Sequence, residues 1–423
     1  MRVLLVTDSF PPHCGGSGWS TYELARGLRA RGVEVALVRP RPGTARDARH
    51  EYDGFAVDEI ATPAPRMPFV RNYFKNERLW RHVAARLTAR LARDPVDVVH
   101  AQHVLSTPPA VRAARRRGIP VVATVRDYWP VCYWSDLIRD RDAAALCPAC
   151  TSANMRRCLR ARAGAAAPIA WPLIPYMRAN LARKRSALAD ADAVIAVSST
   201  MATDLAARAP ELPEGVIRQI PNPVDLDAIR SAAAGSRPPI DGPYAVFSGK
   251  LEPNKGAQHL LRVAERAKLP WPLVVVGDGR LRTAMEAEAR RAGIDARFTG
   301  WLPRDAALGC VAHARLLLFP SHGPESLSRV LLEAGALGIP VAAMDTGGTR
   351  DIIRHEVTGL LSADPDALAA DAARLVADRQ LADTLGRQLR AHVEATFAAP
   401  AVVDRILGVY ADVVRAKAGA AHG

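Results

Sequence analysis

Near its start the chain reads Val3-Leu4-Leu5-Val6-Thr7 and then Pro11-Pro12-His13-Cys14-Gly15-Gly16-Ser17-Gly18. The first run is short and apolar, which is typical of a strand buried on both faces of a parallel sheet. Apolar residues at helical spacing follow the glycines and end near Gly32, and Val33–Val38 predicts the next strand. This order of strand, glycine loop, helix and strand predicts a βαβ unit.

The same order returns in the second half of the chain. Tyr244–Ser248 predicts a strand, Gly249–Gly256 a glycine loop, Ala257–Ala267 a helix and Leu273–Val276 another strand. Further buried strands are predicted at Val96–His100, Val121–Val125, Ala193–Val197, Val216–Ile220, Ala296–Thr299, Leu316–Phe319 and Val341–Met344. We therefore predict two doubly wound, Rossmann-like α/β domains that face each other across a cleft, with ligands at the carboxyl ends of the strands.

We predict the first domain over residues 1–235 with an insertion at about 130–180, and the second over 236–398, after the linker-like stretch Gly235–Pro239. Residues 399–423 predict a helix that packs back on the first domain. The chain has no run of ~18 apolar residues that could span a membrane. Val3–Val6 is too short for the core of a signal peptide. We expect a cytoplasmic protein, with the inner face of the membrane as a second location.

The formal net charge is +14, with 57 basic residues, of which 51 are arginines. A basic surface favours phosphate-bearing ligands and anionic membrane faces. The abundance of arginine and alanine has the appearance of a codon bias, which weakens any inference about nucleic acid. We therefore expect no nucleic-acid partner.

A predicted phosphate site follows the strand that ends at Phe319. A helix is predicted to start near Ser326, where the backbone N–H groups of Ser326 and Leu327 would form an anion site. Glu325 and Glu333 are eight residues apart, roughly 12 Å along a helix at about 1.5 Å per residue. That is the length of a nucleotide diphosphate sugar, so the two carboxylates would bind hydroxyl groups at its two ends.

Positive charge for the diphosphate comes from the second glycine loop, which carries Lys250 and Lys255 directly after a strand. A charge-assisted hydrogen bond to phosphate contributes ~1.5–3 kcal/mol. The leaving diphosphate gains charge in the transition state, so these lysines would act in catalysis as well as binding.

The chain resembles the retaining glycosyltransferases of family 4, which have the two-domain fold called GT-B. The resemblance runs along nearly the whole chain, through Gly15-Gly16, Ala196-Val197-Ser198, Ile220-Pro221-Asn222-Pro223-Val224-Asp225, Gly249-Lys250 with Lys255-Gly256, Val276-Gly277-Asp278-Gly279, the Glu-x7-Glu stretch, and Gly347-Gly348 through Thr358-Gly359-Leu360. It implies transfer of a hexose, with retention, from a nucleotide diphosphate sugar to a saccharide or lipid-linked acceptor in cell-surface polysaccharide or glycoconjugate synthesis. It also implies that this chemistry requires no metal or other cofactor.

The resemblance further implies residue roles. The second domain would bind the donor, Glu325 through the sugar, Glu333 through the ribose, and Lys250 and Lys255 through the diphosphate. In the first domain, which would bind the acceptor, the loop at Gly15 and Gly16 would approach the phosphates.

One departure from the family pattern concerns the reacting sugar. The family often carries a histidine in a strand-end Thr-x-His-Asp pattern, but in this chain the stretch is Thr124-Val125-Arg126-Asp127. Either Arg126 supplies a related positive charge, or His103, at the end of another predicted strand, takes the role of the missing histidine.

Four cysteines, Cys132, Cys147, Cys150 and Cys158, lie close together in the predicted insertion. Their number and the Cys-x-x-Cys pair suit a structural zinc site. Free thiols, a redox-labile pair and iron–sulfur ligation are the alternatives.

Two apolar-basic stretches, Asn76–Arg93 and Ile169–Met177, suit either packing against the first sheet or contact with an anionic membrane, and we favour packing. For the whole chain, the alternatives to glycosyl transfer are a nucleotide-sugar epimerase on the same fold and a non-enzymatic module that binds polyanions or membranes.

Overall fold

The computed structural model describes residues 1–64, 77–140 and 146–420. Its contacts divide it into two compact units. The first contains residues 1–139 and 147–223 and the chain from Ala399 onward, and the second is built chiefly from residues 224–398. The sequence-based boundary at 235/236 is therefore too late, because α9 (Leu226–Ala234) packs against helices of the second unit.

The first unit contains an eight-stranded sheet in the order β3-β4-β2-β1-β5-β6-β7-β8. All neighbouring strands are parallel except β3 and β4. The strands are β1 (Arg2–Val6), β2 (Glu34–Pro42), β3 (Ala48–Tyr52), β4 (Phe55–Thr62), β5 (Val98–Ala101), β6 (Val121–Val125), β7 (Ala193–Ala196) and β8 (Ile217–Gln219).

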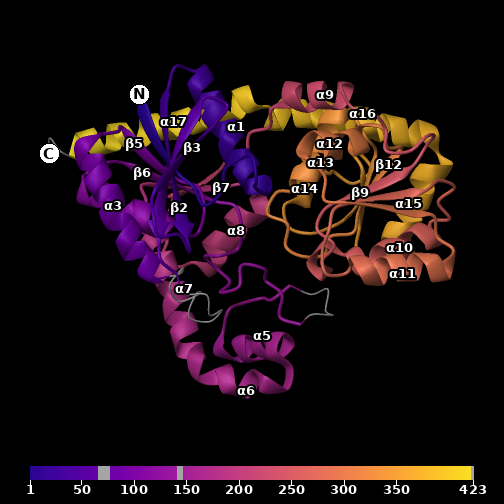
Figure 1. Cartoon of the computed structure of the whole chain (residues 1–423), viewed down its shortest axis with the longest axis horizontal. Coiled ribbons are helices and arrows are strands. Elements are labelled where there is room, and N and C mark those ends of the chain that lie inside the picture. The colour runs from indigo at the N-terminus through magenta and orange to yellow at the C-terminus, as the bar shows by residue number, and fades with distance from the viewer. Residues whose placement is uncertain (65–76, 141–145, 421–423) are drawn as a thin grey trace. The chain divides into compact units, whose positions relative to one another are not determined.

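Helices cover both faces of this sheet (Figure 1). Alternate residues of β1 show the arrangement: Leu4 and Val6 pack in one core with α3 and α4, whereas Val3 and Leu5 pack in the other with α1 and α17. The helices of this unit are α1 (Gly16–Ala30), α3 (Leu79–Arg93), α4 (Thr107–Arg116), α5 (Ser152–Ala163), α6 (Ala167–Ala170), α7 (Ile174–Ala189), α8 (Ser199–Arg208) and α17 (Ala399–Ala420). Two short 3-10 turns, η2 (Gly164–Ala166) and η3 (Trp171–Leu173), connect α5 to α7.

The hairpin of β3 and β4 is absent from the sequence-based prediction. Strand β3 carries charged residues at the edge of the sheet, so it lacks the apolar run that marks the buried strands. Its turn does carry a signal, since Asp53 and Gly54 both have positive φ (50° and 68°), the conformation that an Asp-Gly hairpin turn requires.

The second unit contains a six-stranded parallel sheet in the order β11-β10-β9-β12-β13-β14. The strands are β9 (Ala245–Ser248), β10 (Leu273–Val276), β11 (Ala296–Gly300), β12 (Leu316–Phe319), β13 (Val341–Met344) and β14 (Leu360–Ser362). The remaining elements are η4 (Pro253–Lys255), α10 (Ala257–Arg266), α11 (Arg282–Ala292), α12 (Arg304–Ala312), α13 (Arg329–Leu337), α14 (Thr349–Ile352), α15 (Pro365–Ala377) and α16 (Arg379–Phe397). Helices α10, α11 and α15 share one core with the sheet.

Both sheets follow the doubly wound order, in which the chain starts at a central strand, moves to one edge, returns and continues to the other. The predicted fold class of two doubly wound α/β domains is confirmed. In such a sheet the order reverses between two neighbouring strands, and the loops that follow those two strands diverge and leave room for a ligand. The reversal lies between β1 and β5 in the first unit and between β9 and β12 in the second.

The two apolar-basic stretches differ in how far their apolar residues are buried. In α3 the residues Leu79, Val83, Leu87 and Leu91 are all buried, so this stripe packs in the core as we favoured; Asn76 lies outside the described residues. In the second stretch, Ile174 and Met177 are buried in a small core with Met155 and Leu159, whereas Ile169, Trp171 and Leu173 remain exposed, Ile169 at 83%. Among the described residues no helix is long and apolar enough to cross a membrane.

Candidate active site

The loops that follow β9 and β12 are joined by backbone hydrogen bonds at the reversal point of the second sheet. Gly323 N–H donates to the carbonyl oxygen of Asn254 at 2.8 Å, and Ser321 Oγ lies 3.1 Å from the same oxygen. The loop after β13 joins them, because Gly348 N–H donates to the Glu325 carbonyl at 2.7 Å. Three loops that are far apart in the sequence thus form one surface at the carboxyl end of the sheet.

Two glycines make this close approach possible. Gly256 has φ of +68°, and a Cβ there would lie 1.8 Å from the Pro320 carbonyl oxygen. Gly347 has φ of +50°, and a Cβ there would lie 2.2 Å from the Glu325 carbonyl oxygen. Only glycine fits these positions, because any other side chain would both strain the backbone and overlap a main-chain oxygen.

Glu325 and Lys255 meet at this surface. The Lys255 ammonium lies 2.6 Å from Glu325 Oε1, and Ser321 Oγ donates to the same oxygen. The Glu325 side chain is only 9% exposed, whereas that of Lys255 is 33% exposed. An ammonium has three N–H donors, so Lys255 can keep one on Glu325 and turn the others to a phosphate oxygen. Lys250 lies in the same loop after β9, with its side chain exposed to solvent.

The start of the following helix differs from the prediction. Helix α13 begins at Arg329, not near Ser326, so Glu325, Ser326 and Leu327 all lie in the loop before it. The 12 Å spacing along a helix therefore does not describe Glu325 and Glu333. The amides of the first helical turn belong to Arg329 and the residues after it, not to Ser326 and Leu327. The loops after β9 and β13 form hydrogen bonds with Gly323 and Glu325, just before Ser326.

Glu333 lies within α13 and its carboxylate is paired. Arg329 Nε donates to Glu333 Oε1 at 3.0 Å, and a guanidinium nitrogen of Arg304 lies 3.9 Å from the same oxygen. The side chain of Glu333 is 15% exposed. A ligand hydroxyl would have to share this carboxylate with the two arginines.

His322 and His259 are candidate site residues that the sequence analysis did not name. Their rings lie 5.8 Å apart, edge to face, and His322 follows Ser321 in the loop after β12. His322 Nδ1 is buried and has no hydrogen-bond partner within the part of the chain that the structure describes. A histidine placed between Phe319 and Glu325 could have been noted as a polar residue at a strand end.

At the reversal point of the first sheet, His103 follows β5 and contacts the segment after β1. The Asp8 N–H donates to His103 Nδ1 at 3.2 Å, and Thr7 Oγ1 lies 3.1 Å from the same nitrogen. An accepting Nδ1 assigns the ring proton to Nε2. Nε2 is buried, and the ring also interacts with the backbone of Ser17. Burial, helped by the charge of Arg126, holds the pKa of His103 well below its usual value, so the ring is neutral at pH 7.

Arg126 follows β6 and is almost fully buried. Its Nε donates to Asn222 Oδ1 at 2.8 Å, and Nη1 donates to the Gln102 carbonyl at 3.0 Å. Burial lowers the pKa of Arg126 to about 9, so the guanidinium keeps its charge at neutral pH. The first unit thus presents a fixed cation within electrostatic range of a neutral histidine.

Two carboxyl groups at this edge were not predicted as site residues. Burial raises the pKa of Asp8 from 3.8 to about 7 and that of Asp127 from 3.8 to about 6. Leu105 N–H donates to Asp8 Oδ2 at 2.9 Å, and Trp129 N–H donates to Asp127 Oδ1 at 2.9 Å. Both follow a buried strand by no more than two residues, which is the signal that could have found them.

Gly15 and Gly16 lie at the N-terminus of α1, Gly15 as its N-cap and Gly16 as its first residue. Both are exposed, and a Cβ built on Gly15 would have no atom within 4 Å. Their backbone is therefore accessible to a ligand that approaches the positive end of the helix.

The raised pKa of Asp8 predicts a pH-dependent stability. Since the folded protein holds this proton more tightly than the unfolded chain, its stability falls as the pH rises from about 4 to about 7. Asp8→Asn stays neutral, so at pH 8 we expect it to unfold roughly 2–4 °C above the parent protein, with a smaller difference at pH 5. Thermal unfolding of the variant and the parent protein at pH 5 and pH 8 measures this difference in unfolding temperature. Asp227→Asn changes a side chain that is 97% exposed and is the matched control. It should leave the unfolding temperature unchanged at both pH 5 and pH 8. A gain for Asp8→Asn that is equal at the two pH values would show that ionisation of Asp8 is not its cause.

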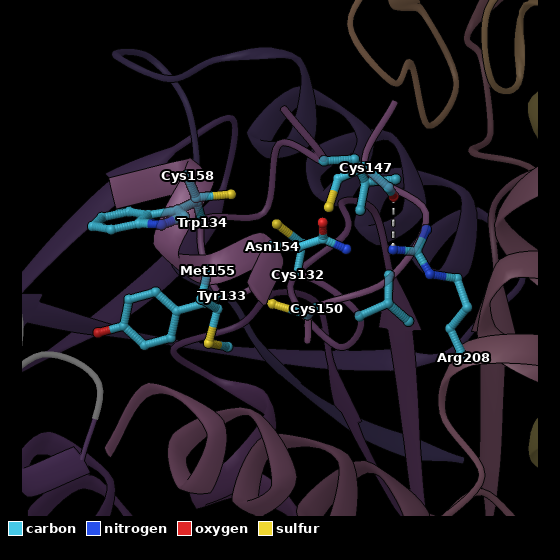
Figure 2. A pocket seen from close by; sticks show the side chains of 11 residues that line it. Cys132, Tyr133, Trp134, Cys147, Cys150, Asn154, Met155, Cys158 and Arg208 are labelled. Atoms are coloured by element: carbon cyan, nitrogen blue, oxygen red, sulfur yellow. Dashed lines mark hydrogen bonds between the residues drawn. The ribbon is translucent and has the colours of Figure 1, made fainter. Parts of the chain in front are cut away.

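The predicted metal ligands Cys132, Cys147, Cys150 and Cys158 all line one small cavity in the first unit (Figure 2). None of these four cysteines forms a disulfide. The described residues contain no group of three or more His, Cys, Asp or Glu side chains arranged to hold a metal ion.

Comparisons with known proteins agree with this geometry. A curated GDP-mannose-dependent alpha-mannosyltransferase of Mycolicibacterium smegmatis is 28% identical over 98% of both chains. A D-inositol 3-phosphate glycosyltransferase of Acidothermus cellulolyticus is 29% identical over 97% of this chain and 89% of its own length.

Solved structures share the fold. Sucrose-phosphate synthase from Thermosynechococcus elongatus superposes with a TM-score of 0.75 at 21% identity, over 98% of this chain and 99% of its own. Anabaena HepE in complex with UDP superposes with a TM-score of 0.65 at 18% identity, over 97% and 100%.

Two family profiles together cover most of the sequence. The one described as "Glycosyl transferases group 1" matches residues 232–392, which include the loops after β9, β12 and β13. The other, described as "Glycosyltransferase Family 4", matches residues 14–228, half of the chain, and begins one residue before Gly15. The chain therefore belongs to glycosyltransferase family 4.

Proposed function

We propose that this glycosyltransferase moves a hexose from a nucleoside diphosphate sugar to a saccharide or lipid-linked acceptor, with retention and without a metal ion on the diphosphate. The observation that carries the proposal is the pairing of Lys255 with the nearly buried Glu325 at the reversal point of the second sheet. An isolated carboxylate there would repel a diphosphate. With an ammonium beside it, the same surface offers a cation to phosphate and an acceptor to sugar hydroxyls.

The roles that we propose are those that membership of family 4 suggests. Lys255 and Lys250 would bind the diphosphate, Glu325 would accept hydrogen bonds from the donor sugar, and Glu333 would bind the ribose while it remains paired with Arg329. As the C1–O bond breaks, the electron pair moves to the diphosphate, and the lysines stabilise the added charge. The acceptor oxygen forms its bond to C1 on the same face, and its proton passes to a phosphate oxygen of the leaving group.

The first unit would contribute the acceptor side. The open backbone of Gly15 and Gly16 would approach the phosphates. Arg126 would place a fixed positive charge, and the buried Nε2–H of His103 would donate to a hydroxyl group or a phosphate oxygen. A lipid-linked acceptor is supported by the exposed side chains of Ile169, Trp171 and Leu173, since the exposed Arg156 guanidinium lies 5.8 Å from the centre of the Trp171 ring.

A transfer assay tests the proposal. We would incubate the protein with UDP- and GDP-sugars and a panel of saccharide and lipid-linked acceptors, with and without EDTA, and measure release of the nucleoside diphosphate. The name of the Mycolicibacterium smegmatis relative and the UDP bound to HepE suggest these donors as the first probes. We expect acceptor-dependent release that EDTA does not reduce, and NMR of the product should show the anomeric configuration of the donor.

Three outcomes would overturn parts of the proposal. An inverted anomer would exclude retention, and activity lost in EDTA and restored by Mg²⁺ or Mn²⁺ would exclude metal independence. Interconversion of the sugar nucleotide without any acceptor would favour the epimerase instead, which the family assignment does not favour.

A further inference from the structure

The four clustered cysteines come from three separate places in the first unit. Cys132 follows the loop after β6, Cys147 and Cys150 form the Cys-Pro-Ala-Cys pair, and Cys158 lies in α5. Their side chains nevertheless line the same cavity (Figure 2). The cavity measures about 10 Å³, which is room for one water-sized body.

The rest of the cavity wall is mostly apolar. It is formed by Val131, Tyr133, Trp134, Leu137, Met155, Asn154 and Arg208. Four thiols can be buried simply as small hydrophobic groups, as single free cysteines often are. A small cavity that all four thiols line is not explained in that way, because well-packed apolar cores close such gaps.

Hydrogen bonds fix the main chain at Cys132, at Cys147 and at the start of α5. Cys132 N–H donates to the Tyr128 carbonyl at 2.8 Å, and Cys147 N–H donates to the Leu137 carbonyl at 2.6 Å. Thr151 caps α5 by accepting from Asn154 N–H at 3.2 Å, which fixes the start of the helix that carries Cys158.

Cations surround the cluster. Arg208 donates to the Cys147 carbonyl at 3.1 Å, and Arg162 donates to the Cys158 carbonyl at 3.3 Å. The buried Lys184 lies with its ammonium 5.6 Å from the centre of the Tyr133 ring. Four thiolates around a divalent ion carry a net charge of about −2, and these three side chains would compensate it.

We propose that Cys132, Cys147, Cys150 and Cys158 bind one structural Zn²⁺ in this cavity. Each cysteine would turn about its Cα–Cβ bond to bring its sulfur to about 2.3 Å from the ion, in place of the present open arrangement of the four thiols. The ion would tie the loop after β6, which carries Arg126 and Asp127, to the pair at Cys147 and Cys150 and to α5. Its role would be to order this loop beside the candidate acceptor site, with no part in the bond-breaking step.

Elemental analysis tests the site directly. The protein, purified without chelators and with any affinity tag removed, should contain about one zinc per chain by mass spectrometry of the elements. The double variant Cys147→Ser/Cys150→Ser should retain less than about a tenth of that zinc, because two of four ligands are lost. Cys310→Ala removes a buried cysteine of the second unit and should keep the full amount.

A second measurement needs no variant. Replacing the zinc with Co²⁺ in the parent protein should produce the intense near-ultraviolet charge-transfer band and visible bands of a tetrahedral cobalt–thiolate site. Iron in place of zinc, the absence of both metals, or zinc that is unchanged in the double variant would each overturn the proposal. These outcomes are independent of the transfer assay, so this proposal and the proposed function can fail separately.

Discussion

Glu325→Ala is expected to lower kcat/KM for sugar transfer by about a thousandfold, or ~4 kcal/mol of transition-state stabilisation. The carboxylate is nearly buried at the reversal point of the second sheet, where Lys255 and Ser321 fix the position of Oε1. In the proposed complex it holds the donor sugar beside the breaking bond. Steady-state assays with the donor and acceptor found in the transfer screen measure the loss.

Two comparisons keep this result interpretable. Glu394→Ala removes a 40% exposed carboxylate of the same unit that is paired with Arg230 and Arg390, and it should change kcat/KM less than about twofold. Thermal unfolding should show that Glu325→Ala remains folded, because Lys255 is partly exposed and water can solvate the ammonium left behind. A folded Glu325→Ala protein with the parent rate would show that this residue does not contact the reacting sugar.

Lys255→Ala is expected to weaken binding of UDP or GDP by roughly 10- to 100-fold while leaving uridine or guanosine binding within about twofold. The lost charge-assisted hydrogen bond accounts for ~1.5–3 kcal/mol. The unpaired Glu325 carboxylate would also repel the diphosphate. Uridine and guanosine carry no phosphate, so neither the lost hydrogen bond nor this repulsion should change their binding. Isothermal titration calorimetry with the four ligands measures the difference.

The matched control is Arg266→Ala, which removes a half-exposed cation of the same unit that is paired with Asp366. Neither nucleotide nor nucleoside binding should change with it. Equal losses of nucleotide and nucleoside binding in Lys255→Ala would show that Lys255 acts on the shape of the pocket and does not contact phosphate. Lys250→Ala should weaken nucleotide binding less than Lys255→Ala, because its side chain is exposed and already well solvated.

Much of the fold was predictable from local sequence. The buried strands β6, β10, β12 and β13 have the predicted ends, because a strand covered on both faces must be an unbroken apolar run. The glycine loop after β9 was equally visible, and Gly256 shows why: its left-handed backbone touches a neighbouring carbonyl, which only glycine permits.

The edge of the first sheet and the start of α13 were not predictable in this way. Strand β3 is polar because it faces solvent at a sheet edge, so it carries no apolar run. Residues Ser326 and Leu327 have no strong helix breaker, yet they stay outside α13. Other loops hold the residues just before them, since Gly348 N–H donates to the Glu325 carbonyl and Gly323 N–H donates to the Asn254 carbonyl.

The sequence by itself determined the two repeated βαβ themes, the glycine loops and the residues that mark family 4, since these depend on apolar periodicity and backbone freedom within short windows. Tertiary structure alone decided that Glu325 pairs with Lys255, that Asn222 and Gln102 hold Arg126, and that Asp8 is buried enough to bind its proton near neutral pH. It also decided that α17 belongs to the first unit although it follows the second along the chain. The physical reason is the same in each case. The surrounding groups determine the free energy of a buried charge or apolar face, and those groups come from elements far apart in the sequence.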